Sequence, residues 1–190
     1  MTFYEEKDIP KNDFFRRLLA KCFTLMEKGA LKNKVITFHI WMSNALKKFT
    51  NNNGVLTREN INSGASVYDI LNETKTIYLY RKEEIEKVCL HELIHALDYD
   101  FKAYPGHLNQ EIKDTLNLPE DITLKIGEAY TEFWANILNT IFVTYFTLKN
   151  KSNFKTTLIK NFKAELGFSL LQCAKILQYY GYSCVTKCNK

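Results

Sequence analysis

The sequence predicts an α+β fold, in which a small sheet precedes a helix with a polar motif and a predominantly helical C-terminal half. Residues 34–42 are rich in β-branched and aromatic side chains, and residues 74–81 alternate apolar with polar, as strands do. From residue 82 onward, apolar residues recur with a helical period through most of the chain. A chain of 190 residues can bury a sizeable core, so we expect one compact domain over 1–190.

Both predicted strands lie in the first half of the chain. A helix over 13–28 precedes them, because its apolar residues share one face. The strand at 34–42 leads into a short helix over 43–50, which the turn-forming run 51–54 ends. Residues 55–72 have no clear period, but we expect an extended piece near 64–67.

Helices account for most of the second half. The helix over 82–101 follows the second strand directly, and the connection after it contains a short helix near 108–116. The apolar run within the helix at 124–148 is shorter than a bilayer span and contains asparagines, so we expect a buried helix and no membrane span. Two further helices cover 152–166 and 168–180, with Gly167 and Gly181 as their stops.

The most informative segment is His91-Glu92-Leu93-Ile94-His95. Residues four apart on a helix are about 40° apart around its axis, so both imidazoles point the same way and can grip one metal ion. On a helical projection these histidines and Glu92 lie on a polar half, opposite a broad apolar half. The pattern is typical of zinc hydrolases, in which the glutamate is a base and not a ligand.

A catalytic zinc site normally has three protein ligands and a water. The best candidate for the third ligand is Glu128, which shares a narrow polar stripe with Glu132 on an otherwise apolar helix. Carboxylates on so apolar a helix are costly to bury unless they are paired or bound to metal. The alternative is a solvated stripe at a helix N-terminus, where acidic residues also favour the dipole.

The motif His91-Glu-Leu-Ile-His95-Ala, followed by Glu128-Ala-x-x-Glu132, resembles the gluzincin metallopeptidases, a group with thermolysin-like and lethal-factor-like members. The resemblance covers roughly residues 75–140 and implies a zincin-like fold. It implies that His91, His95 and Glu128 bind Zn²⁺, that Glu92 is the catalytic base, and that Glu132 orients a histidine ligand. It also implies that an edge strand within 55–80 binds extended peptide.

Asp98 and Phe101 lie close to the motif in the sequence. Asp98 follows His95 by three residues, a spacing awkward for joint coordination, so we expect Asp98 to hydrogen-bond around the ligands instead. A third histidine at position 101 would indicate a metzincin, but Phe101 excludes that class. Several residues are candidates for the donor that stabilises an oxyanion, although a surface position is favoured for the histidine among them. They are Tyr130, Tyr179, Tyr180, Tyr182 and His107.

These features predict a zinc-dependent endopeptidase that hydrolyses a peptide or protein substrate with metal-activated water. The alternative is a metal-stabilised structural or binding protein with a zincin fold and little or no protease activity. The charge of +5 comes from scattered lysines, so no nucleic-acid partner is expected, and no pattern indicates an oligomeric state. A polar N-terminus and an odd cysteine count of five favour a reduced, cytoplasmic protein. The abundance of Phe, Tyr, Ile, Asn and Lys suits an AT-rich genome, such as that of a large DNA virus.

Overall fold

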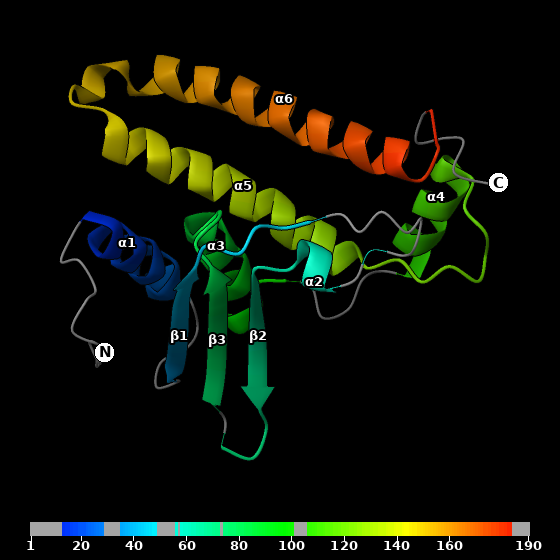
Figure 1. Ribbon diagram of the computed structural model, residues 1–190, viewed down its shortest axis with the longest axis horizontal. Helices are drawn as coiled ribbons and strands as arrows, with labels where there is room; N and C mark the ends of the chain where they lie inside the picture. Colours follow the sequence, from blue (N-terminus) through cyan, green and yellow to red (C-terminus); the bar gives the residue numbers. More distant parts are fainter. Residues whose placement is uncertain are drawn as a thin grey trace.

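The computed structural model describes residues 13–28, 35–48, 56, 58–72, 74–100 and 106–183. Figure 1 shows a small sheet backed by α3 and α1, with two long helices lying above it. The predicted α+β arrangement, with the sheet before the motif helix and mostly helices after it, is confirmed. The elements are α1 (Asp13–Lys28), β1 (Ile36–Ser43), α2 (Arg58–Ile61), β2 (Gly64–Asp69), β3 (Thr74–Arg81), α3 (Ile85–Ala96), α4 (Gly106–Leu116), α5 (Ile126–Thr147), a 3₁₀ turn (Lys151–Asn153) and α6 (Phe154–Tyr179).

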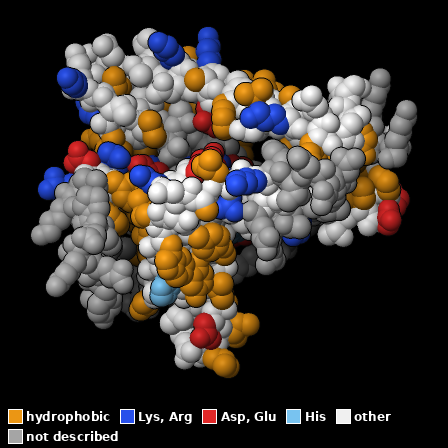
Figure 2. Space-filling view, viewed as in Figure 1, with side chains coloured by type: hydrophobic (Ala, Val, Ile, Leu, Met, Phe, Trp, Pro, Cys, Tyr) orange, Lys and Arg blue, Asp and Glu red, His pale blue; other side chains and the backbone are white. Residues whose placement is uncertain are grey.

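The sheet has three strands in the order β1-β3-β2. The central strand β3 pairs with β1 in parallel and with β2 antiparallel. Side chains alternate across β3, and Ile77 and Leu79 are fully buried in the core that α1 and α3 complete. On the opposite face the rings of His39, Trp41 and Tyr78 lie nearly parallel, with centroids 5.2–5.9 Å apart. Hydrophobic side chains gather over the strands on this face (Figure 2).

Helix α3 lies at the centre because two of its faces are apolar. Cys89, Leu93 and their neighbours pack against α1 and β3 in the larger core cluster. Leu90 and Ile94 pack against Ala135 of α5 in a second cluster. Burial of these faces leaves a narrow polar strip along α3, and that strip carries the histidines of the motif.

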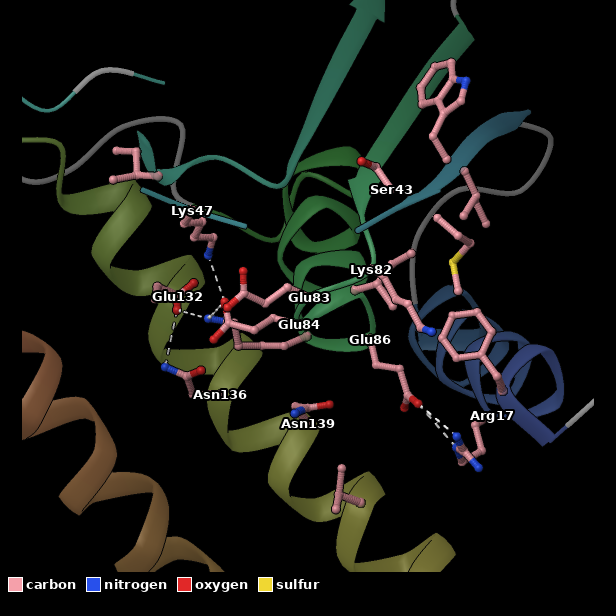
Figure 3. A pocket seen from close by; sticks show the side chains of 18 of the residues that line it. Arg17, Ser43, Lys47, Lys82, Glu83, Glu84, Glu86, Glu132, Asn136 and Asn139 are labelled. Carbon is pink, nitrogen blue, oxygen red and sulfur yellow. Dashed lines mark hydrogen bonds and ion pairs between the residues drawn. The ribbon is translucent and has the colours of Figure 1, made fainter. Parts of the chain in front are cut away.

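A buried ion pair ties α1 to α3 and α5. Lys21 has no exposed surface, and its Nζ donates to Glu86 Oε2 at 2.5 Å and to Asn139 Oδ1 at 2.9 Å. Arg17 reaches the other oxygen of Glu86 at 3.2 Å (Figure 3). A buried ammonium without partners costs several kcal/mol, so this pairing fixes how the three helices meet.

Two sequence-based expectations are wrong for local reasons. No helix forms at residues 44–48, because the Ala45 N–H donates to Ser43 Oγ at 3.2 Å, a local turn that competes with helix formation. Gly167 does not stop a helix, since α6 continues through it. Gly181 does, because it adopts a φ of 75° and its N–H bonds to the Gln178 carbonyl at 3.0 Å.

The apolar run of α5 is only partly covered. Its buried residues are Thr131, Ala135, Thr140 and Thr144, whereas Phe133 is 57% exposed. The helix expected to be buried is therefore buried along one side only. Among the described residues, no helix has both the length and the apolarity that a membrane crossing requires.

Candidate metal centre

The centre lies between α5 and β2, on the polar strip of α3. Successive residues turn by about 100°, so His91 and His95 face outward between Leu90 and Ile94 on one side and Glu92 on the other. Leu90 and Ile94 pack toward α5, which brings its first turn, with Glu128, close to the histidines. Glu92 is directed toward β2. The apolar pattern of α3 thus aims the motif at the gap between two other elements.

The three predicted ligands converge. Nε2 of His91 lies 3.2 Å from Nε2 of His95, and Glu128 Oε2 lies 3.4 Å from each nitrogen. In a tetrahedral zinc site with bonds of about 2.0–2.1 Å, neighbouring ligand atoms are about 3.3–3.4 Å apart. The three atoms therefore form one face of a tetrahedron of the size that zinc requires. The Glu128 side chain is 58% exposed, so the centre is open to solvent on that side.

The outer nitrogens of both histidines are held by carboxylates. His91 Nδ1 lies 3.0 Å from Glu132 Oε2, and His95 Nδ1 lies 2.9 Å from Asp100 Oδ2. A carboxylate can only accept, so each Nδ1 carries a proton, and a ring in its neutral form then presents a lone pair at Nε2. With both rings neutral, two lone pairs and a carboxylate oxygen would face one another, an arrangement that a cation, whether a metal ion or a proton on Nε2, stabilises.

Glu132 is part of a chain of charges that runs away from the centre. Lys87 Nζ lies 2.7 Å from Glu132 Oε1 and 3.8 Å from Glu84 Oε2, which also pairs with Lys47 at 2.8 Å. Figure 3 shows Lys47, Glu84 and Glu132 extending toward one another. Burial alone would raise the pKa of Glu132, but the hydrogen bond with His91 and the charge of Lys87 outweigh it and lower this pKa to about 2. Glu132 is therefore an anion at neutral pH, and its hydrogen bond fixes the orientation of the His91 ring.

The same neighbours affect the pKa of His91. Burial alone would lower the pKa of His91, but the hydrogen bond with Glu132 and the nearby charges of Glu92, Glu132 and Glu128 raise it. The site thus favours positive charge at the place where the ligand atoms meet.

Glu92 lies beside the ligands and under β2. Its side chain is 7% exposed, and burial raises its pKa, although His91, the Ser66 hydroxyl and His95 partly offset this. The strand comes very close here, because a Cβ on Gly64 would lie 2.7 Å from Val88 Cγ1 and 3.2 Å from Glu92 Cγ. Only glycine at this position lets β2 lie so close to Glu92.

Two acidic residues, Asp98 and Asp100, follow the end of α3, and the contacts of Asp98 differ from those expected. Asp98 has a φ of 57°, and its N–H bonds to the His95 carbonyl while Tyr99 N–H bonds to the Ile94 carbonyl, at 3.0 and 2.9 Å. This Schellman turn reverses the chain. Asp98 then pairs with Lys75 at 2.7 Å, and the carboxylate that holds His95 is that of Asp100. The role expected of Asp98 belongs to Asp100, which five-residue spacing on a helix would not suggest.

The candidates for an oxyanion donor are spread over three helices. His107 is exposed in the first turn of α4, as expected of a surface residue. The Tyr130 ring packs against Trp134 at 6.3 Å, and the Tyr180 hydroxyl accepts a bond from the Leu56 N–H at 3.2 Å. Tyr179 packs edge-on against Tyr180, and Tyr182 follows the end of α6.

No protein-family model matches the chain, and no solved structure matches it. Over 111 residues the chain is 34% identical to an uncharacterised protein of Acanthamoeba polyphaga mimivirus. The match covers 58% of this chain but only 28% of that relative's length. A giant-virus relative agrees with the expectation of an AT-rich source such as a large DNA virus.

Proposed function

We propose that this chain is a zinc-dependent endopeptidase with a zincin-like fold of the gluzincin kind. The observation that carries the proposal is the triangle of His91 Nε2, His95 Nε2 and Glu128 Oε2, with sides of 3.2–3.4 Å, beside the buried carboxyl of Glu92. A histidine pair and a carboxylate, with one open side, are the donor set of many catalytic zinc sites.

The residues of the chain divide the work among them. His91, His95 and Glu128 would hold the metal, and Glu132 and Asp100 keep both rings in the required orientation and tautomer. A bound zinc ion would act as a Lewis acid, which polarises the scissile carbonyl and lowers the pKa of a water. Glu92 takes the proton from the attacking water and delivers it to the leaving amine. Its raised pKa suits this shuttle, because a stronger base accepts the proton more readily.

The substrate would lie along the outer edge of β2. Tyr80 N–H donates to the Ser63 carbonyl at 3.0 Å, which marks these two residues as a hydrogen-bonded pair across the ladder. Alternation then turns the backbone polar groups of Gly64, Ser66 and Tyr68 away from β3, toward the edge at which no described strand pairs. An extended peptide that adds to this edge would pass between β2 and the polar strip of α3.

The test combines metal content with cleavage of a mixed peptide library, followed by mass spectrometry. The purified protein should contain one zinc per chain and cleave, and Glu92→Gln should keep the metal but lose about 10²–10⁴-fold in rate. Glu83→Gln is the matched control, because this exposed glutamate precedes α3 outside the centre. A zinc-loaded protein that cleaves nothing, yet melts at a lower temperature after chelation, would favour the metal-stabilised structural alternative.

A further inference from the structure

A cavity of about 320 Å³ opens beside the candidate metal centre, between the edge strand and the end of α3. It lies next to the ligand triangle and shares one residue with it. His95 lines it, and so does Ser66, whose hydroxyl donates to Glu92. The remaining lining residues are Val67, Tyr68, Lys75, Ala96 and Asp98.

An ion pair forms one wall of this cavity. Lys75 is 5% exposed, its Nζ lies 2.7 Å from Asp98 Oδ2, and it is 5.4 Å from the ring centroid of Tyr68. Asp98 is held rigidly, because it sits in the left-handed position of the Schellman turn. Residues other than glycine are uncommon in this conformation, although aspartate and asparagine adopt it more readily than most.

We propose that this cavity binds a carboxamide side chain of the substrate, that of glutamine or asparagine, next to the cleaved bond. The inference rests on the proposed peptidase function. A peptide on the edge of β2 directs alternate side chains toward α3, as Ser66 and Tyr68 of β2 are directed. Because His95 lines the cavity and Ser66 of the same lining hydrogen-bonds Glu92, a side chain that enters it would belong to a residue near the cleaved bond.

The chemistry of the wall favours a neutral side chain with both a donor and an acceptor. An ammonium has three N–H groups and a carboxylate has several acceptor sites, so the Lys75–Asp98 pair can bond further partners. A carboxamide offers its oxygen to Lys75 and its NH₂ to Asp98 at once. A carboxylate side chain would face Asp98, and a cationic one would face the buried Lys75, so each would bring an unmatched charge to the pair.

The experiment uses the zinc-loaded chain and three peptides that differ at one residue beside the cleaved bond, which is Gln, Glu or Leu. For the wild type, kcat/KM should be about ten- to hundredfold higher for Gln than for either other peptide. In Asp98→Asn the preference should move to Glu, because Lys75 is then unbalanced. Asparagine tolerates the left-handed backbone, so this variant should fold. Asp121→Asn, an exposed position after α4, is the control that should keep the Gln preference.

Binding to zinc-loaded Glu92→Gln is measured in parallel with the same peptides, so that the two proposals fail separately. Cleavage without a Gln preference, or a preference that Asp98→Asn leaves unchanged, overturns the carboxamide site while the peptidase stands. Gln-selective binding with no cleavage by the wild type supports the site and ends the peptidase proposal. Equal binding of all three peptides overturns the site whatever the rate of cleavage.

Discussion

Replacement of Gly64 by alanine tests the close packing of β2 on α3, on which the position of Glu92 depends. The added Cβ would lie 2.7 Å from Val88 Cγ1, 3.0 Å from the Tyr78 carbonyl oxygen and 3.2 Å from Glu92 Cγ. Ordinary contacts between carbon atoms are about 3.5–4.0 Å. Val88 would therefore have to retreat by about 1 Å, and the backbone oxygen of Tyr78 cannot rotate away.

The cost follows from this overlap. Overpacking of a close-packed core costs about 1–3 kcal/mol, and in a chain of this length each kcal/mol lowers the melting temperature by about 2–4 °C. Gly64→Ala should therefore lower the melting temperature by about 2–12 °C. The rate of peptide hydrolysis should also fall, even at temperatures where the variant is fully folded, because any shift of Glu92 changes its distance to the ligand triangle.

Thermal and denaturant unfolding measure the effect, and Gly167→Ala is the matched control. A Cβ at Gly167 meets nothing within 4 Å, and this glycine lies inside α6. Alanine is favoured over glycine in a helix interior by about 0.5–1 kcal/mol, so the control should be more stable than the wild type. Opposite signs are expected for the two alanines. If Gly64→Ala is as stable as the wild type, β2 does not pack on α3 as closely as described.

Three further predictions concern the charged residues. Glu132→Gln and Asp100→Asn should each weaken zinc binding about 10–100-fold in a competition titration with a chromogenic chelator, whereas equal affinity would contradict their orienting role. Because burial raises the pKa of Glu92, a profile of kcat/KM should fall with decreasing pH earlier than for an ordinary glutamate, and a profile flat through that range would exclude Glu92 as the base. Lys21→Met should lower the free energy of unfolding by about 3 kcal/mol in urea, near the lower limit for broken buried pairs because Glu86 keeps Arg17; an unchanged value would refute the buried pair.

Stability against acid follows from Glu132. Its folded-state pKa of about 2 is below the ordinary value of 4.5, so its contribution is complete above pH 4.5 and is lost as the pH falls toward 2. The difference in unfolding free energy between the wild type and Glu132→Gln should shrink over that interval. A difference that is constant from pH 5 to pH 2 would contradict the depressed pKa.

Local patterns were enough for those parts of the fold in which one element carries the signal. The helix over 13–28 and the strand over 74–81 have the predicted bounds, because each has a periodic face long enough to identify. Local spacing was also enough to pair His91 with His95 and Glu128 with Glu132, since a spacing of four places both members of a pair on one helical face. Gly167 and Gly181 could not be distinguished by type, because only the backbone conformation after each decides whether a helix ends.

The sequence by itself therefore determined the chemical groups of the centre and the helices that present them. Only the tertiary structure decided which residues surround these groups. Asp100 holds His95, Asp98 pairs with Lys75, and Gly64 lets β2 pack over Glu92. The physical reason is that helical periodicity acts over a few residues. A turn that reverses the chain, or a strand that packs on a helix, joins residues whose separation in sequence has no fixed relation to their separation in space.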